Sequence, residues 1–125
     1  MIAVLDDDEP VRKALVRLLR SAGFAACSYA SGGEFLAHRR DARLQCLVVD
    51  LQMPGASGLD VQRSLRSAGE NVPTIVMTSR EESELLEECL AAGAFACLSK
   101  PLEGEQLFAA LEQIHVQRDD GQPLN

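Results

Sequence analysis

Polar residues of types that suit chemistry stand in four places along this 125-residue chain, each directly after a short apolar run. They are Asp6-Asp7-Asp8, Asp50, Thr78-Ser79 and Ser99-Lys100. Taken singly, an acidic run more simply caps a helix, an aspartate forms an Asx turn and a lysine is a surface cation. Their recurrence after apolar runs favours one shared site.

The carboxylates of Asp6, Asp7 and Asp50 would repel one another at such a site. A hard divalent cation with oxygen ligands, most naturally Mg²⁺, relieves this repulsion. A cation and a lysine beside an aspartate suit aspartyl-phosphate chemistry, because the metal and the ammonium neutralise the phosphoryl oxygens while the carboxylate acts as nucleophile.

The run Leu47-Val48-Val49 is expected to deliver Asp50 to that site. Apolar residues that end on one aspartate and break at Pro54-Gly55 are typical of a buried strand with the charge at its carboxyl end. A strand covered on both faces cannot hold a charge midway, so the strand end is where Asp50 can meet solvent, metal or substrate.

The rest of the chain alternates between strand and helix patterns, which predicts a single α/β domain with a five-stranded parallel sheet and helices on both faces. Strands are expected near residues 2–5, 25–29, 47–50, 74–77 and 96–98, and helices near 10–22, 31–38, 57–68, 81–92 and 107–114. Ligands bind at the carboxyl ends of such strands. The domain is expected to cover residues 1–116, and residues 117–125, which lack periodicity, to form a linker or disordered tail.

Composition excludes several classes of protein. A formal net charge of −7 argues against direct nucleic acid binding by this segment, because phosphate contacts need a basic surface. No apolar run is long enough to cross a membrane, and the start of the chain has no signal-peptide pattern. Four cysteines without a CxxC pair fit a reducing compartment, so we expect a cytoplasmic location.

In order and spacing, these groups resemble the receiver (REC, CheY-like) domain of two-component response regulators. The strings Asp-Asp-Asp-Glu-Pro-Val-Arg and Val-Val-Asp-Leu-Gln-Met-Pro-Gly-Ala-Ser-Gly-Leu are most similar to the FixJ type. The likeness covers residues 2 to about 116. It implies a flavodoxin-like, CheY-like sheet with strand order 2-1-3-4-5.

The resemblance also implies residue roles. Asp50 would be the phosphoacceptor, with Asp7 and Asp50 as direct Mg²⁺ ligands, Asp6 holding the metal through water, and Mn²⁺ as a possible substitute. The backbone carbonyl of Gln52 would complete the protein's share of the metal coordination.

Two further residues belong to the implied site. Lys100 would pair with the phosphoryl group through a cis Lys100-Pro101 bond that aims the lysine. The Thr78 hydroxyl would turn toward the phosphoryl group as the first step of a switch.

The family's partners follow from the same resemblance. The phosphodonor would be the phosphohistidine of a sensor histidine kinase. The domain would catalyse only its own phosphorylation and slow dephosphorylation, so it is not expected to be an enzyme in the usual sense. A DNA-binding output domain is expected beyond Asn125, with homodimer formation on phosphorylation; a stand-alone receiver acting through protein contacts is the alternative.

The switch position departs from the family pattern. Receivers commonly carry Tyr or Phe three residues before the lysine, and this chain has Cys97 there. We expect weak coupling through position 97, because cysteine has neither the ring nor the volume of an aromatic residue. Redox sensing by Cys97 is an alternative, although a lone cysteine in an apolar strand is more often inert packing.

Two other classes of protein compete with this interpretation. A flavodoxin-like FMN module would need a phosphate-binding loop after the first strand, where this chain has three aspartates that repel phosphate. A phosphatase with an aspartate nucleophile would need a DxD arrangement at the first strand and a cap domain.

Overall fold

The computed structural model describes residues 1–38, 44–51, 53, 55–79 and 83–121. Within them, strands and helices alternate along the chain: β1 (Ile2–Leu5), α1 (Glu9–Ser21), β2 (Ala26–Tyr29), α2 (Gly32–His38), β3 (Cys46–Asp50), α3 (Gly58–Ser67), β4 (Thr74–Thr78), α4 (Ser83–Ala91), β5 (Ala96–Ser99) and α5 (Gly104–Gly121). None of the described helices is both long and apolar enough to span a membrane.

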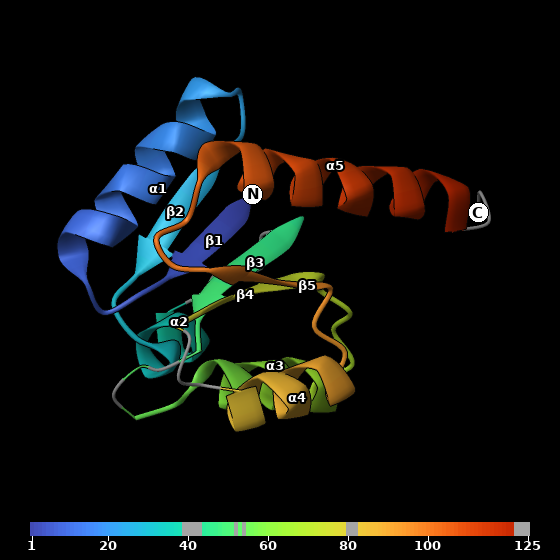
Figure 1. Ribbon diagram of the computed structural model, residues 1–125. Coiled ribbons are helices and arrows are strands. Elements are labelled where there is room, and N and C mark those ends of the chain that lie inside the picture. Colours follow the sequence, from blue (N-terminus) through green and yellow to red (C-terminus); the bar gives the residue numbers. More distant parts are fainter. Residues whose placement is uncertain (39–43, 52, 54, 80–82, 122–125) are drawn as a thin grey trace.

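The strands form one parallel sheet in the order β2-β1-β3-β4-β5. Helices α1 and α5 cover one face, and α2, α3 and α4 cover the other (Figure 1). This arrangement confirms the predicted fold class, including the flavodoxin-like strand order.

Alternate side chains of β1 belong to two separate parts of the core, one on each face of the sheet. Ile2 and Val4 pack with residues of α1 and α5, whereas Ala3 and Leu5 pack with residues of α2, α3 and α4. Successive side chains of a strand point to opposite faces, so a strand between two helical layers must be apolar throughout. All four residues of β1 are buried, and the first charged group after them is Asp6.

Local capping explains where two helices begin. The Asp8 side chain accepts a hydrogen bond from Val11 N at 3.3 Å, which caps the N-terminus of α1 just before Pro10. Ser57 caps α3, and the Asp60 carboxylate accepts a hydrogen bond from Ser57 N at 3.0 Å, which completes a capping box.

Helix α5 extends further along the chain than the apolar pattern of the sequence predicts. It continues to Gly121, beyond residue 116 where the sequence loses periodicity. The C-terminal part of α5 projects past the sheet (Figure 1), where no neighbouring layer requires an apolar stripe. The expected domain boundary near residue 116 therefore stays a prediction, although the backbone there is helical.

Two α3 side chains hold the end of α4. Gln62 Nε2 donates to Cys89 O at 3.4 Å, and Arg66 Nη1 donates to Ala92 O at 3.1 Å. The Cys89 carbonyl also accepts from Ala94 N at 3.0 Å, so Gln62 adds a second donor to it, and Arg66 gives the Ala92 carbonyl, one residue past α4, a partner. The C-terminal end of α4 is thereby attached to α3.

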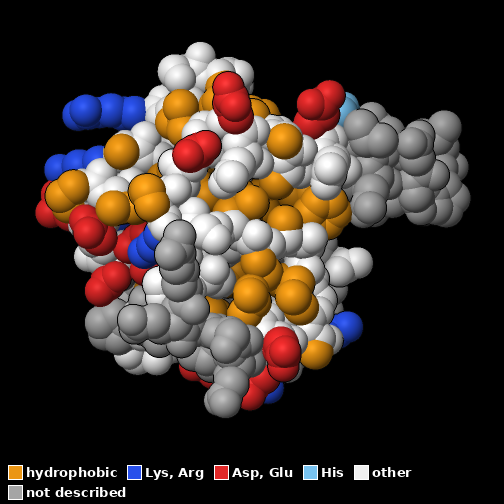
Figure 2. Space-filling view, viewed as in Figure 1, with side chains coloured by type: hydrophobic (Ala, Val, Ile, Leu, Met, Phe, Trp, Pro, Cys, Tyr) orange, Lys and Arg blue, Asp and Glu red, His pale blue; other side chains and the backbone are white. Residues whose placement is uncertain are grey.

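An apolar groove of about 500 Å³ lies beneath α5, at the amino-terminal ends of β1 and β3. Its walls include Ile2, Phe24 and Phe108. Hydrophobic side chains gather below α5 in Figure 2, with charged side chains around them.

Gly32 permits a close approach between α2 and α3. A Cβ at this position would lie 2.7 Å from Val61 Cγ2 and 2.8 Å from Ala56 O. We expect Gly32→Ala to lower the free energy of unfolding by about 1–3 kcal/mol, the usual cost of overpacking, measured by urea denaturation. Gly33→Ala is the matched control, since its Cβ would meet nothing nearer than Ser31 Oγ at 4.0 Å. Equal effects of the two substitutions would contradict this account.

Candidate functional site

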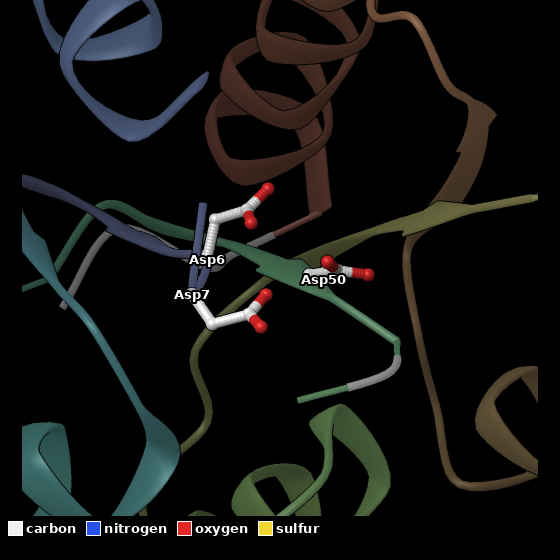
Figure 3. A group of neighbouring side chains, drawn as sticks. All are labelled: Asp6, Asp7 and Asp50. Carbon is white, nitrogen blue, oxygen red and sulfur yellow. The ribbon is translucent and has the colours of Figure 1, made fainter. Parts of the chain in front are cut away.

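The structure brings Asp6, Asp7 and Asp50 together at the carboxyl ends of β1 and β3. Leu5 and Val49 are partners in the β1–β3 register, so the residues that follow them, Asp6 and Asp50, are placed side by side. Ligand oxygens of the three carboxylates lie within 4.8 Å of one another. Figure 3 shows the three side chains leaving neighbouring strand ends toward the same space.

Asp6 is the most deeply held member of the cluster. Its side chain is fully buried, and its Oδ1 accepts a hydrogen bond from Asp8 N at 2.9 Å. Its Oδ2 is buried without a hydrogen bond among the described residues, and lies 3.2 Å from Lys100 Nζ. A buried carboxylate oxygen in this condition is costly unless a cation faces it.

Lys100 reaches the cluster from the end of β5. Its Nζ lies 2.6 Å from Asp50 Oδ2, in addition to its contact with Asp6. Partial burial would lower the pKa of Lys100, but the hydrogen bond and charge of Asp50, followed by the charge of Asp6, outweigh burial and raise this pKa. The Lys100-Pro101 bond is cis, as the resemblance implied.

Thr78 ends β4 next to this contact. The Thr78 backbone oxygen accepts a hydrogen bond from Lys100 N at 2.8 Å, and Thr78 is the register partner of Ser99. Thr78 and Asp50 are each 6 % exposed. Asp50 pairs in register with Met77, the residue before Thr78. Thr78 therefore lies one residue beyond the partner of Asp50, at the same edge of the sheet.

The composition of the site suits a divalent cation. Three carboxylates face one ammonium, so charge is left over that a dication would neutralise. Carboxylate oxygens are the ligands that Mg²⁺ prefers, and Asp6 Oδ2 is a buried oxygen that only Lys100, among the described residues, faces with a positive charge, at 3.2 Å. The residues present therefore fit a magnesium ion. Gln52, whose carbonyl was predicted to join the set, lies outside the described residues.

Two neighbours of the site were missed by sequence reasoning. A Cβ on Gly58 would lie 3.3 Å from Asp50 O, so a glycine lets α3 approach the end of β3. Arg12 Nη1 donates to Asp6 O at 2.9 Å. A glycine directly after the Ser57 cap was a readable signal, whereas the arginine resembled any other basic residue on the outer face of a helix.

Cys97 stands at the position where receivers commonly carry a switch aromatic, and it packs in a different part of the core from Phe95. Cys97 is partly buried and packs with the residues under α2, α3 and α4, whereas Phe95 packs with those under α1 and α5. Phe95 therefore lies with the opposite layer and cannot replace the missing ring. Among the four cysteines, Cys46 and Cys89 are buried, and Cys27 and Cys97 are partly exposed.

Comparison with known proteins identifies the family. Residues 2–112 match the response regulator receiver domain, and the chain belongs to this family. It is 38% identical over 112 residues to the transcriptional regulatory protein FixJ of Rhizobium meliloti (strain 1021), covering 90% of this chain and 55% of that protein. It is 36% identical over 111 residues to the response regulator protein TodT of Pseudomonas putida, covering 89% of this chain and 49% of that protein.

A solved structure supports the same family membership. The crystal structure of FixJ-N matches with a TM-score of 0.83 and 37% identity, covering 90% of each chain. The chain is thus a receiver domain of the two-component response regulator family. It spans about half the length of the curated relatives that it matches.

The cysteines near α4 should react slowly in the native protein. Burial raises the pKa of Cys89 to about 11, with the Cys97 thiol and the Glu88 carboxylate acting in the same direction, and burial also raises the pKa of Cys97. At pH 8 a thiol with a pKa of about 11 is only about 0.1% thiolate. We expect iodoacetamide to label both cysteines more slowly in the native protein than in urea, as measured by peptide mass spectrometry.

The raised pKa of Cys89 also makes the free energy of unfolding depend on pH. The unfolded chain ionises Cys89 near its ordinary pKa of 9.0, whereas the native protein keeps the proton until the pKa of about 11. The contribution of Cys89 to the free energy of unfolding is therefore present below pH 9 and is lost as the pH rises from 9.0 to about 11.

In the labelling experiment, native labelling of Cys97 as fast as in urea would contradict the expected burial and would favour redox sensing.

Proposed function

We propose that this receiver domain is switched by phosphorylation of Asp50. The observation that carries the proposal is the 2.6 Å contact between Lys100 Nζ and Asp50 Oδ2, beside the acidic pair Asp6 and Asp7. A nucleophilic carboxylate, an ammonium and a set of oxygen ligands stand within reach of one another. These are the parts that phosphoryl transfer to a carboxylate requires.

The reaction follows from these contacts. A carboxylate oxygen of Asp50 attacks the phosphorus of a phosphohistidine, the new O–P bond forms as the P–N bond breaks, and the histidine nitrogen leaves with the bonding electron pair. The product is an acyl phosphate on Asp50, and its slow hydrolysis resets the domain. Lys100 already lies against Asp50, so it remains within reach of the phosphoryl oxygens while keeping Asp6 as a counter-ion.

Asp6, Asp7 and Asp50, with the carbonyl of Gln52, would hold Mg²⁺, for which Mn²⁺ could substitute. When bound, the metal supplies positive charge that neutralises the phosphoryl oxygens. Thr78 would turn its hydroxyl toward the phosphoryl group. Its place at the end of β4, bonded through its carbonyl to Lys100 N, supports this role.

The partners follow from the family. The donor would be a sensor histidine kinase, and the domain would act on itself alone, so it is not an enzyme in the usual sense. The relative from Rhizobium meliloti is named as a transcriptional regulator, and this chain covers 55% of it. We therefore propose a DNA-binding output domain elsewhere in the whole protein, with homodimer formation on phosphorylation, in the cytoplasm.

The rival FMN-binding function has little support in the described residues. The apolar groove of about 500 Å³ lies at the amino-terminal ends of β1 and β3, whereas cofactors of such sheets bind at the carboxyl ends. The carboxyl ends carry three aspartates, which would repel the FMN phosphate.

Acetyl phosphate with Mg²⁺ should add one phosphate to the protein, and Asp50→Asn should abolish the addition. The reason is that Asp50 contacts Lys100 and stands beside the acidic pair. Intact-protein mass spectrometry gives the stoichiometry. Asp60→Asn, at an exposed aspartate of α3, is the matched control and should label normally. Labelling retained in Asp50→Asn would show that another residue is the nucleophile.

Mg²⁺ should raise the melting temperature, because it relieves repulsion among carboxylates that only the native fold brings together. At a concentration one hundred times the dissociation constant, linkage gives about 2.7 kcal/mol of added stability. Asp7→Ala should remove most of the shift seen by scanning calorimetry. An unchanged melting temperature in millimolar Mg²⁺ at neutral pH would argue against the metal site.

A further inference from the structure

Arg12 is the one basic side chain of α1 that the structure joins by a hydrogen bond to the described part of the candidate site. Its Nη1 donates to the backbone oxygen of Asp6 at 2.9 Å, and the contact is partly buried. The cap formed by Asp8, the bond from Arg12 N to Asp8 O and the Lys13–Glu9 ion pair also steady this end of α1, but none of them contacts the acidic pair Asp6 and Asp7. The guanidinium thus reaches back over the first turn of its own helix to the acidic loop.

The acceptor of this bond decides the orientation of Asp7. The Asp6 carbonyl belongs to the peptide group that joins Asp6 to Asp7, and a peptide group is planar and rigid. Fixing its oxygen restrains this plane and with it the position of Asp7 Cα, from which the Asp7 side chain leaves the backbone. Asp7 itself is exposed, so packing alone does not hold it.

Asp6 is fixed at its other polar groups too. Its N donates to Tyr29 O at 3.3 Å, and its Oδ1 accepts from Asp8 N at 2.9 Å. With its carbonyl held by Arg12, the group left without a hydrogen bond among the described residues is Oδ2, which is buried. One oxygen of Asp6 and one oxygen of Asp7 lie within 4.8 Å of each other and of a carboxylate oxygen of Asp50.

We propose that Arg12 is a positioning residue for the divalent cation. By holding the peptide group between Asp6 and Asp7, it keeps both carboxylates aimed at the space shared with Asp50. This inference rests on the proposed magnesium site and adds a residue that acts through the ligands without contacting the metal. The charge of Arg12 alone would repel a cation, so positioning and simple electrostatics predict opposite effects on metal affinity.

The test is Mg²⁺ titration of the metal-free domain, followed by amide chemical shifts, since the chain has no tryptophan. Arg12→Met keeps the aliphatic stem and removes every donor. We expect it to bind Mg²⁺ about tenfold more weakly, which corresponds to about 1.4 kcal/mol. Arg17→Met is the matched control, because Arg17 is an exposed residue of the same helix and its loss makes the same change in net charge.

A third variant separates positioning from general loss of structure. Arg12→Lys keeps the positive charge and offers N–H donors, so it should recover part of the lost affinity, and the amide shift of Asp7 should move back toward the wild-type position without metal. The proposal would be overturned if Arg12→Met bound Mg²⁺ as tightly as Arg17→Met does, or more tightly than the wild-type protein. Absence of Mg²⁺ binding by the wild-type protein would overturn the metal site itself, and with it this inference.

Discussion

Repulsion among carboxylates at one edge of the sheet is the constraint on which the rest of the site depends. Two unit charges about 5 Å apart repel by roughly 3 kcal/mol at an effective dielectric constant of about 20. The fold accepts this cost because the positions of Asp6 and Asp50 are set by the buried pairing of β1 with β3. The energy that holds the charges together therefore comes from apolar burial on both faces of the sheet.

Strand order explains why the cluster forms where it does. From β1 the chain passes to β2 on one side, and β3, β4 and β5 follow on the other side. At such a point the loops after adjacent strands diverge and leave a crevice. The acidic residues come from the two strands that flank this point, and Lys100 reaches across from β5 to contact both Asp6 and Asp50. One long side chain thus joins strands that are not neighbours.

The sequence was informative wherever one residue's environment is set by its neighbours in the chain. Apolar runs ending on Asp6, Asp50 and Thr78 predicted strands and strand ends, because burial on both faces leaves no other place for polar groups. The Ser57 cap was predictable for the same local reason. Parallel order then brought the strand ends to one edge, as expected.

Features set by contacts between distant segments were not readable in this way. Gly32 is required by the approach of Val61 Cγ2 and Ala56 O, and nothing within its own helix marks it. The bond from Arg12 to Asp6 O spans only six residues, but it crosses the turn between β1 and α1, and no pattern within either element marks it. The length of α5 was hidden because apolar periodicity reports burial and not helix formation.

The packing around α4 limits how a change at the site could spread under the proposed function. The C-terminal end of α4 is attached to α3 by the bonds to Cys89 O and Ala92 O. Cys97 lies in the layer beneath α4, but it has no ring to follow a moving Thr78, and Phe95 packs with the opposite layer. Under the proposed function, the C-terminal end of α4 is therefore a restrained end when Thr78 moves. A side-chain relay through β5 has no large group to carry it, so in this chain the helix itself is the better candidate for transmission.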